Sequence, residues 1–345
     1  MTGPGRAPRA DGDAVTGPGP QGAVTGPGPG PQADGGGAEA GTGVRSLWWA
    51  ARTGGEAPFD TAHLKVHYPA APDGDRLTGV FAPRGGPYPV VLFLSGINVG
   101  QDAYRWLAVE IARAGFVCVT FDRVGELFGG ERGLTPGVDL DAAAPAAYGS
   151  RPTCPAIGAV LASLAGIELL KGAIDLERVA LGGHSAGGSV VLQSARHFPQ
   201  VRAVFAYGAH TMVATMLGWP PGTVLPAQVD CPVLLATGTR DGVISGSADR
   251  YGQEGHAHDP VTRTFEEALG GGGEHLLAVL EGANHFTVAD PVDPTAARAF
   301  LDLPATADRR PELGRLITSF LRAHLHGDAR ARAVLDGLDL RRSHA

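Results

Sequence analysis

Short apolar runs alternate with helix-like stretches along most of the chain, starting at about residue 44. The runs at 90–94 and 117–121 are almost wholly apolar, as expected for strands buried on both faces. Between them, apolar side chains four residues apart predict a helix over 103–114, and Gly115 stands where that helix should end. Further strands are predicted at 64–68, 77–81, 178–181, 203–207, 233–237 and 276–280, and further helices at 156–172, 186–198 and 315–325.

The repeated alternation of strand and helix predicts an α/β fold. We expect a mostly parallel central sheet with helices on both faces, because parallel neighbours need a crossover connection between them. Ligands of such sheets bind beyond the carboxyl ends of the strands. Reactive residues are therefore expected in the segments that directly follow each strand.

Glycine and proline are concentrated at the start of the chain. The sequence holds 52 Gly and 27 Pro, and 14 and 7 of them fall in residues 1–43, where the sequence AVTGPGP occurs at both 14–20 and 23–29. Few apolar side chains are present there to offset the entropy lost on ordering. We expect a disordered arm over 1–43 and a single domain over 44–345.

Composition excludes several classes of protein. The formal charge of −7 argues against nucleic acid as a main partner. Without a run of 18 apolar residues the chain has no expected transmembrane helix, and Arg6 and Arg9 are not followed by the apolar segment of a secretory signal. Three scattered cysteines form neither a disulfide framework nor a metal cluster, so we expect a cytoplasmic protein without a metal site.

The strongest chemical signal is the sequence Gly-His-Ser-Ala-Gly at 183–187. It lies between the predicted strand 178–181 and the predicted helix 186–198, which is the context that the G-x-S-x-G motif requires. The glycines let the strand and the helix pass close to each other, so that Ser185 is exposed on a tight turn. The sequence therefore predicts Ser185 as a nucleophile, the alternative being an incidental serine in a glycine-rich turn.

A serine hydroxyl needs a base, and the base needs an acid that orients it. Asp241 follows the predicted strand 233–237 and His285 follows the strand 276–280, in the chain order Ser, acid, His. Each residue alone could belong to an ordinary surface turn or loop. Their order and their places at strand ends favour Asp241 as the acid and His285 as the base.

The developing oxyanion also needs backbone N–H donors. One is expected from Ala186, the residue after the nucleophile, and the second from the loop after the strand 90–94. In that loop we favour Ile97, with Asn98 as the other candidate.

These motifs together resemble those of the α/β-hydrolase superfamily. The similarity is nearest to the branch that contains dienelactone-hydrolase-like esterases, chlorophyllases and bacterial cutinases, and it runs through 89–96, 104–122, 179–188, 231–241 and 282–285. It implies a Ser185/Asp241/His285 triad and an Ile97/Ala186 oxyanion hole. Dienelactone hydrolases proper use a cysteine nucleophile, and many relatives carry histidine at the position of Ser95.

The function expected from this chemistry is hydrolysis of a carboxylic ester, lactone or thioester through an acyl-enzyme. The partner is then a small acyl substrate, and no cofactor is needed. Acyl transfer or elimination at the same site, or an inactive binding module, are the alternatives. Candidate substrate contacts are Asn98, His184, His210, Met212 and Trp219, although apolar residues of this kind also fill protein cores.

Overall fold

The computed structural model describes residues 43–70, 83–127, 129–253, 259–269 and 273–343. The predicted disordered arm lies outside these residues except for Gly43, and the predicted strand 77–81 lies outside them entirely. From Gly43 on, the described residues belong to one compact unit.

A mixed sheet runs through the centre of this unit. In the described chain it has nine strands in the order β1 (Gly43–Arg52), β2 (Thr61–Ala70), β4 (Val117–Asp122), β3 (Tyr88–Leu94), β7 (Ile174–His184), β8 (Val201–Tyr207), β9 (Val233–Gly238), β10 (His275–Leu280) and β11 (Arg341–Arg342). The neighbours from β4 to β10 pair in parallel, whereas β1, β2 and β11 pair antiparallel at the two ends. The predicted mostly parallel sheet is confirmed.

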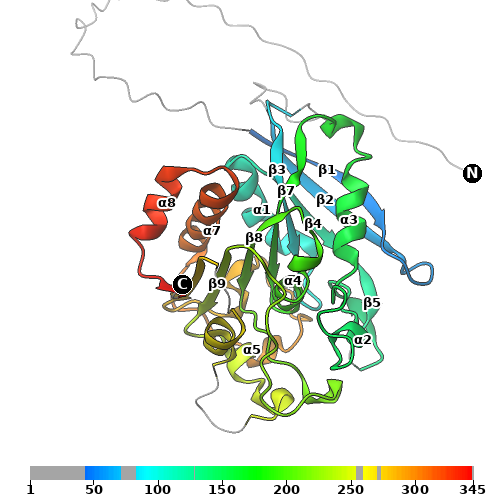
Figure 1. Ribbon diagram of the computed structural model, residues 1–345, viewed down its shortest axis with the longest axis vertical. Helices are drawn as coiled ribbons and strands as arrows, with labels where there is room; N and C mark the ends of the chain where they lie inside the picture. The colour runs from blue at the N-terminus through cyan, green and yellow to red at the C-terminus, as the bar shows by residue number, and fades with distance from the viewer. Residues whose placement is uncertain (1–42, 71–82, 128, 254–258, 270–272, 344–345) are drawn as a thin grey trace, which may run out of the picture. The chain divides into compact units, whose positions relative to one another are not determined.

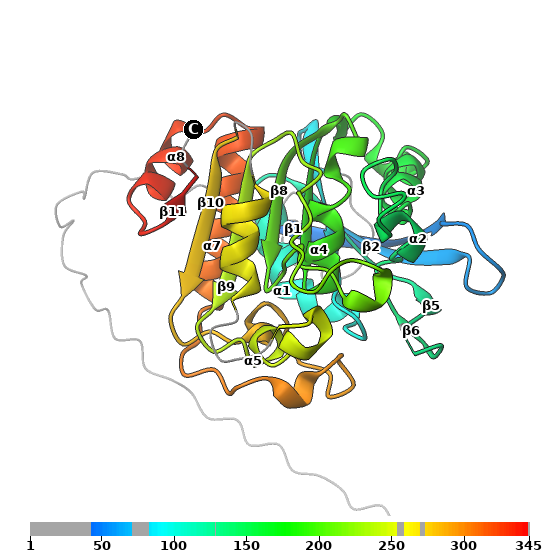
Figure 2. The ribbon, with the colours of Figure 1, turned by 60° about the horizontal axis from the view of Figure 1, so that its bottom comes forward.

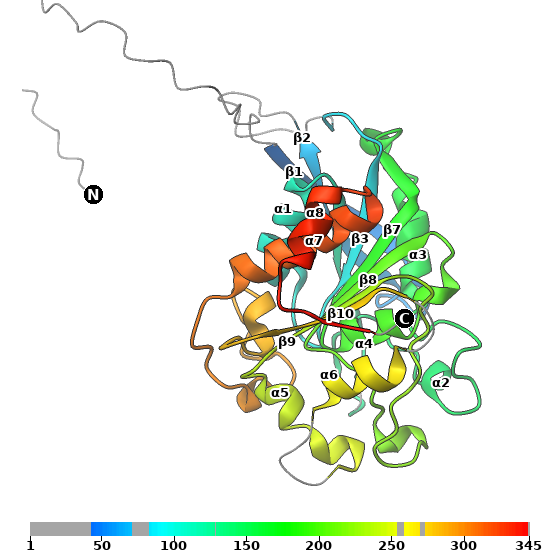
Figure 3. The same cartoon turned by 60° about the vertical axis from the view of Figure 1, so that its left-hand side comes forward.

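Helices cover both faces of the sheet (Figure 1). The alternation along β3 shows why: Val90, Leu92 and Leu94 belong to one apolar core, and Val91 and Phe93 to the other. The first core is closed by α3 (Ala156–Leu164), α4 (Ala186–Leu192) and α6 (Pro260–Arg263). The second is closed by α1 (Arg105–Arg113), α7 (Arg310–Leu325) and α8 (Ala329–Asp336), and Figure 3 shows α7 and α8 in front of the sheet.

Short elements gather beyond the carboxyl ends of the parallel strands. Figure 2 shows α5 (Gly242–Ser245) and the segment after β10 beneath the ends of β8 and β9. The long excursion after β4 contains a small hairpin, β5 (Val124–Glu126) with β6 (Arg132–Leu134), followed by α2 (Leu140–Ala143). The segments expected to carry chemistry therefore lie at one edge of the sheet.

Two predicted helices are shorter than the sequence pattern indicated. The helix predicted over 156–172 ends at Leu164, because Ile167 takes extended backbone to place its side chain in the core before a separate 3-10 turn at Glu168–Leu170. The helix predicted over 186–198 ends at Leu192, with a further 3-10 turn at Ala195–His197. In each case apolar residues continue at helical spacing past the end of the helix, so the sequence pattern does not reveal where the helix ends.

Candidate active site

Ser185 occupies a strained turn between β7 and α4. Its backbone has φ 53° and ψ −123°, a conformation that side-chain-bearing residues rarely adopt and that is held only where the surroundings enforce it. The Ser185 N–H donates to the carbonyl of Tyr207 at the end of β8 (3.0 Å). The turn therefore presents the serine beyond the carboxyl edge of the sheet.

The glycines around Ser185 are required by contact. A Cβ on Gly183 would collide with the backbone of Gly187 and Gly188, and a Cβ on Gly187 would collide with the carbonyl of Leu94 in β3. The strand and the helix approach each other so closely that only glycine fits at both positions.

Asp241 and His285, the predicted acid and base, follow β9 and β10 and form a buried pair. Nδ1 of His285 donates to Oδ2 of Asp241 at 2.9 Å, and both side chains are almost fully buried. The other carboxylate oxygen of Asp241 accepts the N–H of Ile244 (2.9 Å) at the start of α5. With its proton on Nδ1, neutral His285 has an unprotonated Nε2.

A second carboxylate, Asp302, lies behind this pair. It accepts the backbone N–H groups of Gly242 (3.1 Å), His285 (3.2 Å) and Phe286 (3.4 Å). Burial raises the pKa of Asp302, and the hydrogen bond from His285 opposes that rise. The side chain thus joins the loop that carries Asp241 to the loop that carries His285.

The loop after β3 is fixed on several sides. Asn98 has φ 55°, its N–H donates to the carbonyl of Leu134 (2.9 Å), and its Oδ1 accepts the N–H of Leu134 (3.0 Å). The carbonyl of Ile97 accepts the N–H of Ala297 (3.1 Å), whereas within the described chain the Ile97 N–H has no hydrogen-bond acceptor. Of the two candidate donors in this loop, Ile97 is therefore the one left available.

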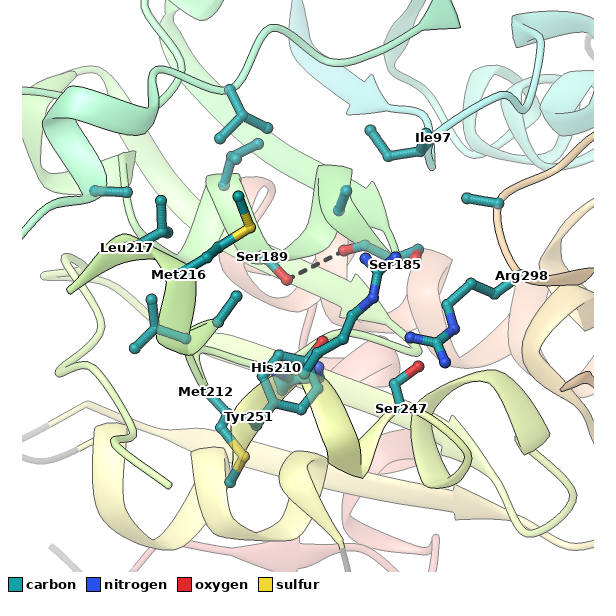
Figure 4. Close-up of a pocket in the computed structure, with 18 of the residues that line it drawn as sticks. Ile97, Ser185, Ser189, His210, Met212, Met216, Leu217, Ser247, Tyr251 and Arg298 are labelled. Atoms are coloured by element: carbon teal, nitrogen blue, oxygen red, sulfur yellow. Dashed lines mark hydrogen bonds between the residues drawn. The ribbon is translucent and has the colours of Figure 1, made fainter. Parts of the chain in front are cut away.

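Ser185, Ile97 and Ala186 line one cavity of about 620 Å³ (Figure 4). Ala186 is the first residue of α4, so its N–H has no acceptor within the helix. Asn98, His210 and Met212 line the same cavity, with the ring of His210 edge-on to Tyr251 at 4.8 Å between centroids. Three of the five predicted substrate contacts are therefore brought to the cavity wall.

The other two predicted substrate contacts, His184 and Trp219, do not line the cavity. The ring of His184 is fully buried behind the turn, with Tyr104 hydroxyl 2.8 Å from Nδ1 and the carbonyl of His285 3.1 Å from Nε2. Trp219 donates from its indole to the carbonyl of Ala143 (2.8 Å) and does not line the cavity. The two residues that were expected to contact substrate are instead used within the protein's own packing.

Among the described side chains, no hydrogen bond joins Ser185 Oγ to His285 Nε2, and His285 does not line the cavity. Ser185 and His285 are instead each in contact with one of two successive residues, Tyr207 and Gly208. Tyr207 accepts the N–H of Ser185, and Gly208 lies against the His285 ring. Such contacts are often long in ligand-free enzymes and tighten with substrate.

Several residues of the cavity wall were not predicted from the sequence. They include Arg250, Arg298, Ser247 and Tyr251, which come from loops that the alternation of strands and helices did not describe. Ser189 lies one turn after Ser185 on α4, with its Oγ donating to the carbonyl of Ser185 (3.3 Å). Of these residues, only Ser189 could have been inferred from the sequence. It is four residues after Ser185, and residues four apart lie on the same face of a helix.

None of the helices in the described part of the chain is long and apolar enough to cross a membrane. No curated protein matches the chain significantly. Residues 78–287, more than half of the chain, match the model of the dienelactone hydrolase family. The chain therefore belongs to the dienelactone hydrolase family, a branch of the α/β-hydrolase superfamily whose members are hydrolases.

Proposed function

We propose that the protein is a serine hydrolase that cleaves a carboxylic ester, lactone or thioester through an acyl-enzyme on Ser185. One observation carries the proposal: Ser185 stands on a strained turn in the wall of a cavity that also contains Ile97 and Ala186. The buried Asp241–His285 pair follows the two neighbouring strands at the same edge of the sheet. This is the set of groups that acyl transfer to a hydroxyl requires.

In this mechanism Ser185 Oγ forms a bond to the substrate carbonyl carbon while its proton passes to Nε2 of His285. The N–H groups of Ile97 and Ala186 stabilise the negative charge on the carbonyl oxygen. When the bond to the leaving group breaks, His285 returns the proton to the departing oxygen or sulfur. A water molecule then attacks the acyl group, His285 takes one of its protons, and the released serine is protonated again.

The cavity supports a substrate with two different ends. Met212, Met216 and Leu217 supply apolar surface, and Figure 4 shows Met216 and Leu217 on the opposite side of Ser185 from Arg298. Arg298 and Arg250 supply positive charge to the wall. We infer an ester with an apolar group on one side of the scissile bond and an anionic group on the other.

The three cysteines Cys118, Cys154 and Cys231 are all free. This state supports a reducing compartment, and we propose the cytoplasm.

The test is covalent labelling together with turnover. A fluorophosphonate probe should label the wild type but not Ser185→Ala, and the wild type should hydrolyse p-nitrophenyl esters while Ser185→Ala loses at least about three orders of magnitude in kcat. Ser189→Ala is the matched control, because it removes a hydroxyl from the same cavity wall and should still be labelled. Equal labelling of wild type and Ser185→Ala would refute the assignment.

A further inference from the structure

Behind the predicted catalytic groups, Tyr104 and His184 connect three loops that the proposed reaction uses. Tyr104 ends the 3-10 turn Gln101–Tyr104, and His184 is the last residue of β7; both side chains are fully buried. The Gly96 N–H donates to the Tyr104 hydroxyl (3.0 Å), which lies 2.8 Å from Nδ1 of His184. Nε2 of His184 lies 3.1 Å from the carbonyl oxygen of His285.

The protons in this set of contacts have one consistent arrangement. A carbonyl oxygen only accepts, so Nε2 of His184 must carry the proton that points to His285. Burial lowers the pKa of His184 well below its usual value, so the ring is neutral and holds a single proton. Nδ1 is then unprotonated and accepts the Tyr104 O–H, while the Tyr104 oxygen accepts the Gly96 N–H.

The three hydrogen bonds therefore run in one direction, from Gly96 through Tyr104 and His184 to His285. Bonds arranged in this way polarise one another, and low dielectric surroundings strengthen them. At one end, Gly96 directly precedes Ile97, so the fixed Gly96 peptide restricts the direction of the Ile97 N–H. At the other end, the fixed carbonyl belongs to His285 itself.

The close packing around Gly96 also supports a connection between these loops. A Cβ on Gly96 would lie 3.1 Å from Nδ1 of His184 and 3.3 Å from Cβ of Ser185, so the loop rests directly on the nucleophile turn. The ring of His184 is also 4.6 Å from that of His285 between centroids. A change in this set of bonds would therefore move the loop that carries Ile97 relative to both Ser185 and His285.

We propose that Tyr104 and His184 are positioning residues, whose directed hydrogen bonds align the Ile97 N–H and His285 for the reaction at Ser185. They touch no substrate and act through Gly96 and the His285 carbonyl. The inference rests on the proposed function, in that it gives these residues a role in the same reaction.

The first test is Tyr104→Phe in the full chain, which keeps the ring and removes only the hydroxyl. We expect kcat for a p-nitrophenyl ester to fall about 10- to 100-fold with KM changed by less than about threefold, since the ground state uses the oxyanion donors less than the transition state does. Binding of an alkylboronic acid, which forms a tetrahedral adduct on serine, should weaken in parallel. The control is Trp49→Phe, which removes a hydrogen bond to Ser163 (3.1 Å) between β1 and α3.

A drop in kcat of less than about fivefold, or an equal drop in Trp49→Phe, would overturn the proposal. The second test needs no activity: ¹⁵N NMR of the histidine rings in the wild type, with the His184 signals identified by their loss in His184→Gln. A slowly exchanging Nε2–H and an unprotonated Nδ1 support the proposal, and any other protonation of this ring overturns it. Failure of the proposed function would appear separately, as a wild type that neither hydrolyses esters nor reacts with fluorophosphonate.

Discussion

Gly208 leaves no room for a side chain beside His285. A Cβ at this position would lie 2.9 Å from Nδ1 of His285 and 3.0 Å from Oδ2 of Asp241, the two atoms that share a hydrogen bond. The backbone of Gly208 also has φ 55°, which favours glycine. The end of β8 is therefore shaped to let the acid and the base meet.

We expect Gly208→Ala to lower kcat about tenfold or more, because the methyl group would separate Asp241 from His285. Gly172→Ala is the matched control: Gly172 also has positive φ (75°), but nothing lies within 4 Å of its Cβ direction. Both variants carry the same kind of backbone strain, of order 1 kcal/mol. Ester hydrolysis and thermal unfolding measured on both separate the two effects, and equal kcat values would contradict this reading of Gly208.

Asp302 offers a second test of how the two loops are held. Asp302→Ala removes the acceptor of three backbone N–H groups, so the loops of Asp241 and His285 lose one of the connections between them. We expect kcat to fall about tenfold with a smaller change in KM, together with a lower Tm. Asp302→Asn keeps one carbonyl oxygen and should recover part of the loss.

The matched control for this change is Asp328→Ala. Asp328 accepts the N–H groups of Arg330 and Ala331 at the start of α8, so its loss also removes backbone hydrogen bonds and lowers Tm. Its kcat should stay at the wild-type value. If both alanine variants reduced kcat to the same extent, Asp302 would matter only for stability.

The sequence pointed to the residues at the centre of the candidate site because their signals are local. The tight turn at Ser185 requires the glycines on either side of it. Asp241 and His285 each follow a strand that is visible in the sequence as a short apolar run. No comparable local sequence pattern distinguishes Asp302 or Arg298. They come from the segment between β10 and α7, whose path over the sheet depends on tertiary contacts rather than on periodicity.

Two of the elements that the sequence pattern did not predict, β1 and α8, have side chains that break the usual patterns. In β1, Trp48 faces outward and is 60% exposed, with the ammonium group of Lys65 4.8 Å from its ring centroid, so apolar and polar residues do not alternate. In α8, only Ala331 and Leu335 are buried, too few to give a visible apolar stripe. Packing against the rest of the fold, not local pattern, stabilises both elements.

Stability should depend on pH through His67, which is buried in β2. Burial and the nearby charges of Lys65 and Arg105 lower its pKa to about 4, while Asp102 opposes the shift. Between about pH 6.5 and 4 the unfolded state therefore binds a proton that the folded state does not, and stability falls as the pH falls. The shift corresponds to about 3 kcal/mol over that range.

Urea unfolding at pH 7, 5.5 and 4.5 measures this dependence. His67→Leu should flatten the curve in that range, and His63→Leu, which removes an exposed histidine from the same strand, is the matched control. An unchanged slope in His67→Leu would assign the acid sensitivity to other groups, of which buried His184 is the first to examine.

Arg298 should select for the charge of the substrate. Its guanidinium lines the cavity and contacts Asp249 and the carbonyl of Gly246 only at 3.4 Å, so it is not held by short hydrogen bonds. We expect Arg298→Gln to lower kcat/KM about 10- to 100-fold for a p-nitrophenyl ester whose acyl chain ends in a carboxylate, because a charge-assisted hydrogen bond contributes about 1.5–3 kcal/mol. The kcat/KM for the neutral ester of equal length should change by less than about threefold.

The control is Arg113→Gln, which removes an exposed arginine from α1. It should leave the ratio of kcat/KM values for the two substrates at its wild-type value. A ratio that Arg298→Gln also left unchanged would show that the anionic end of the substrate binds elsewhere, with Arg250 the next residue to test.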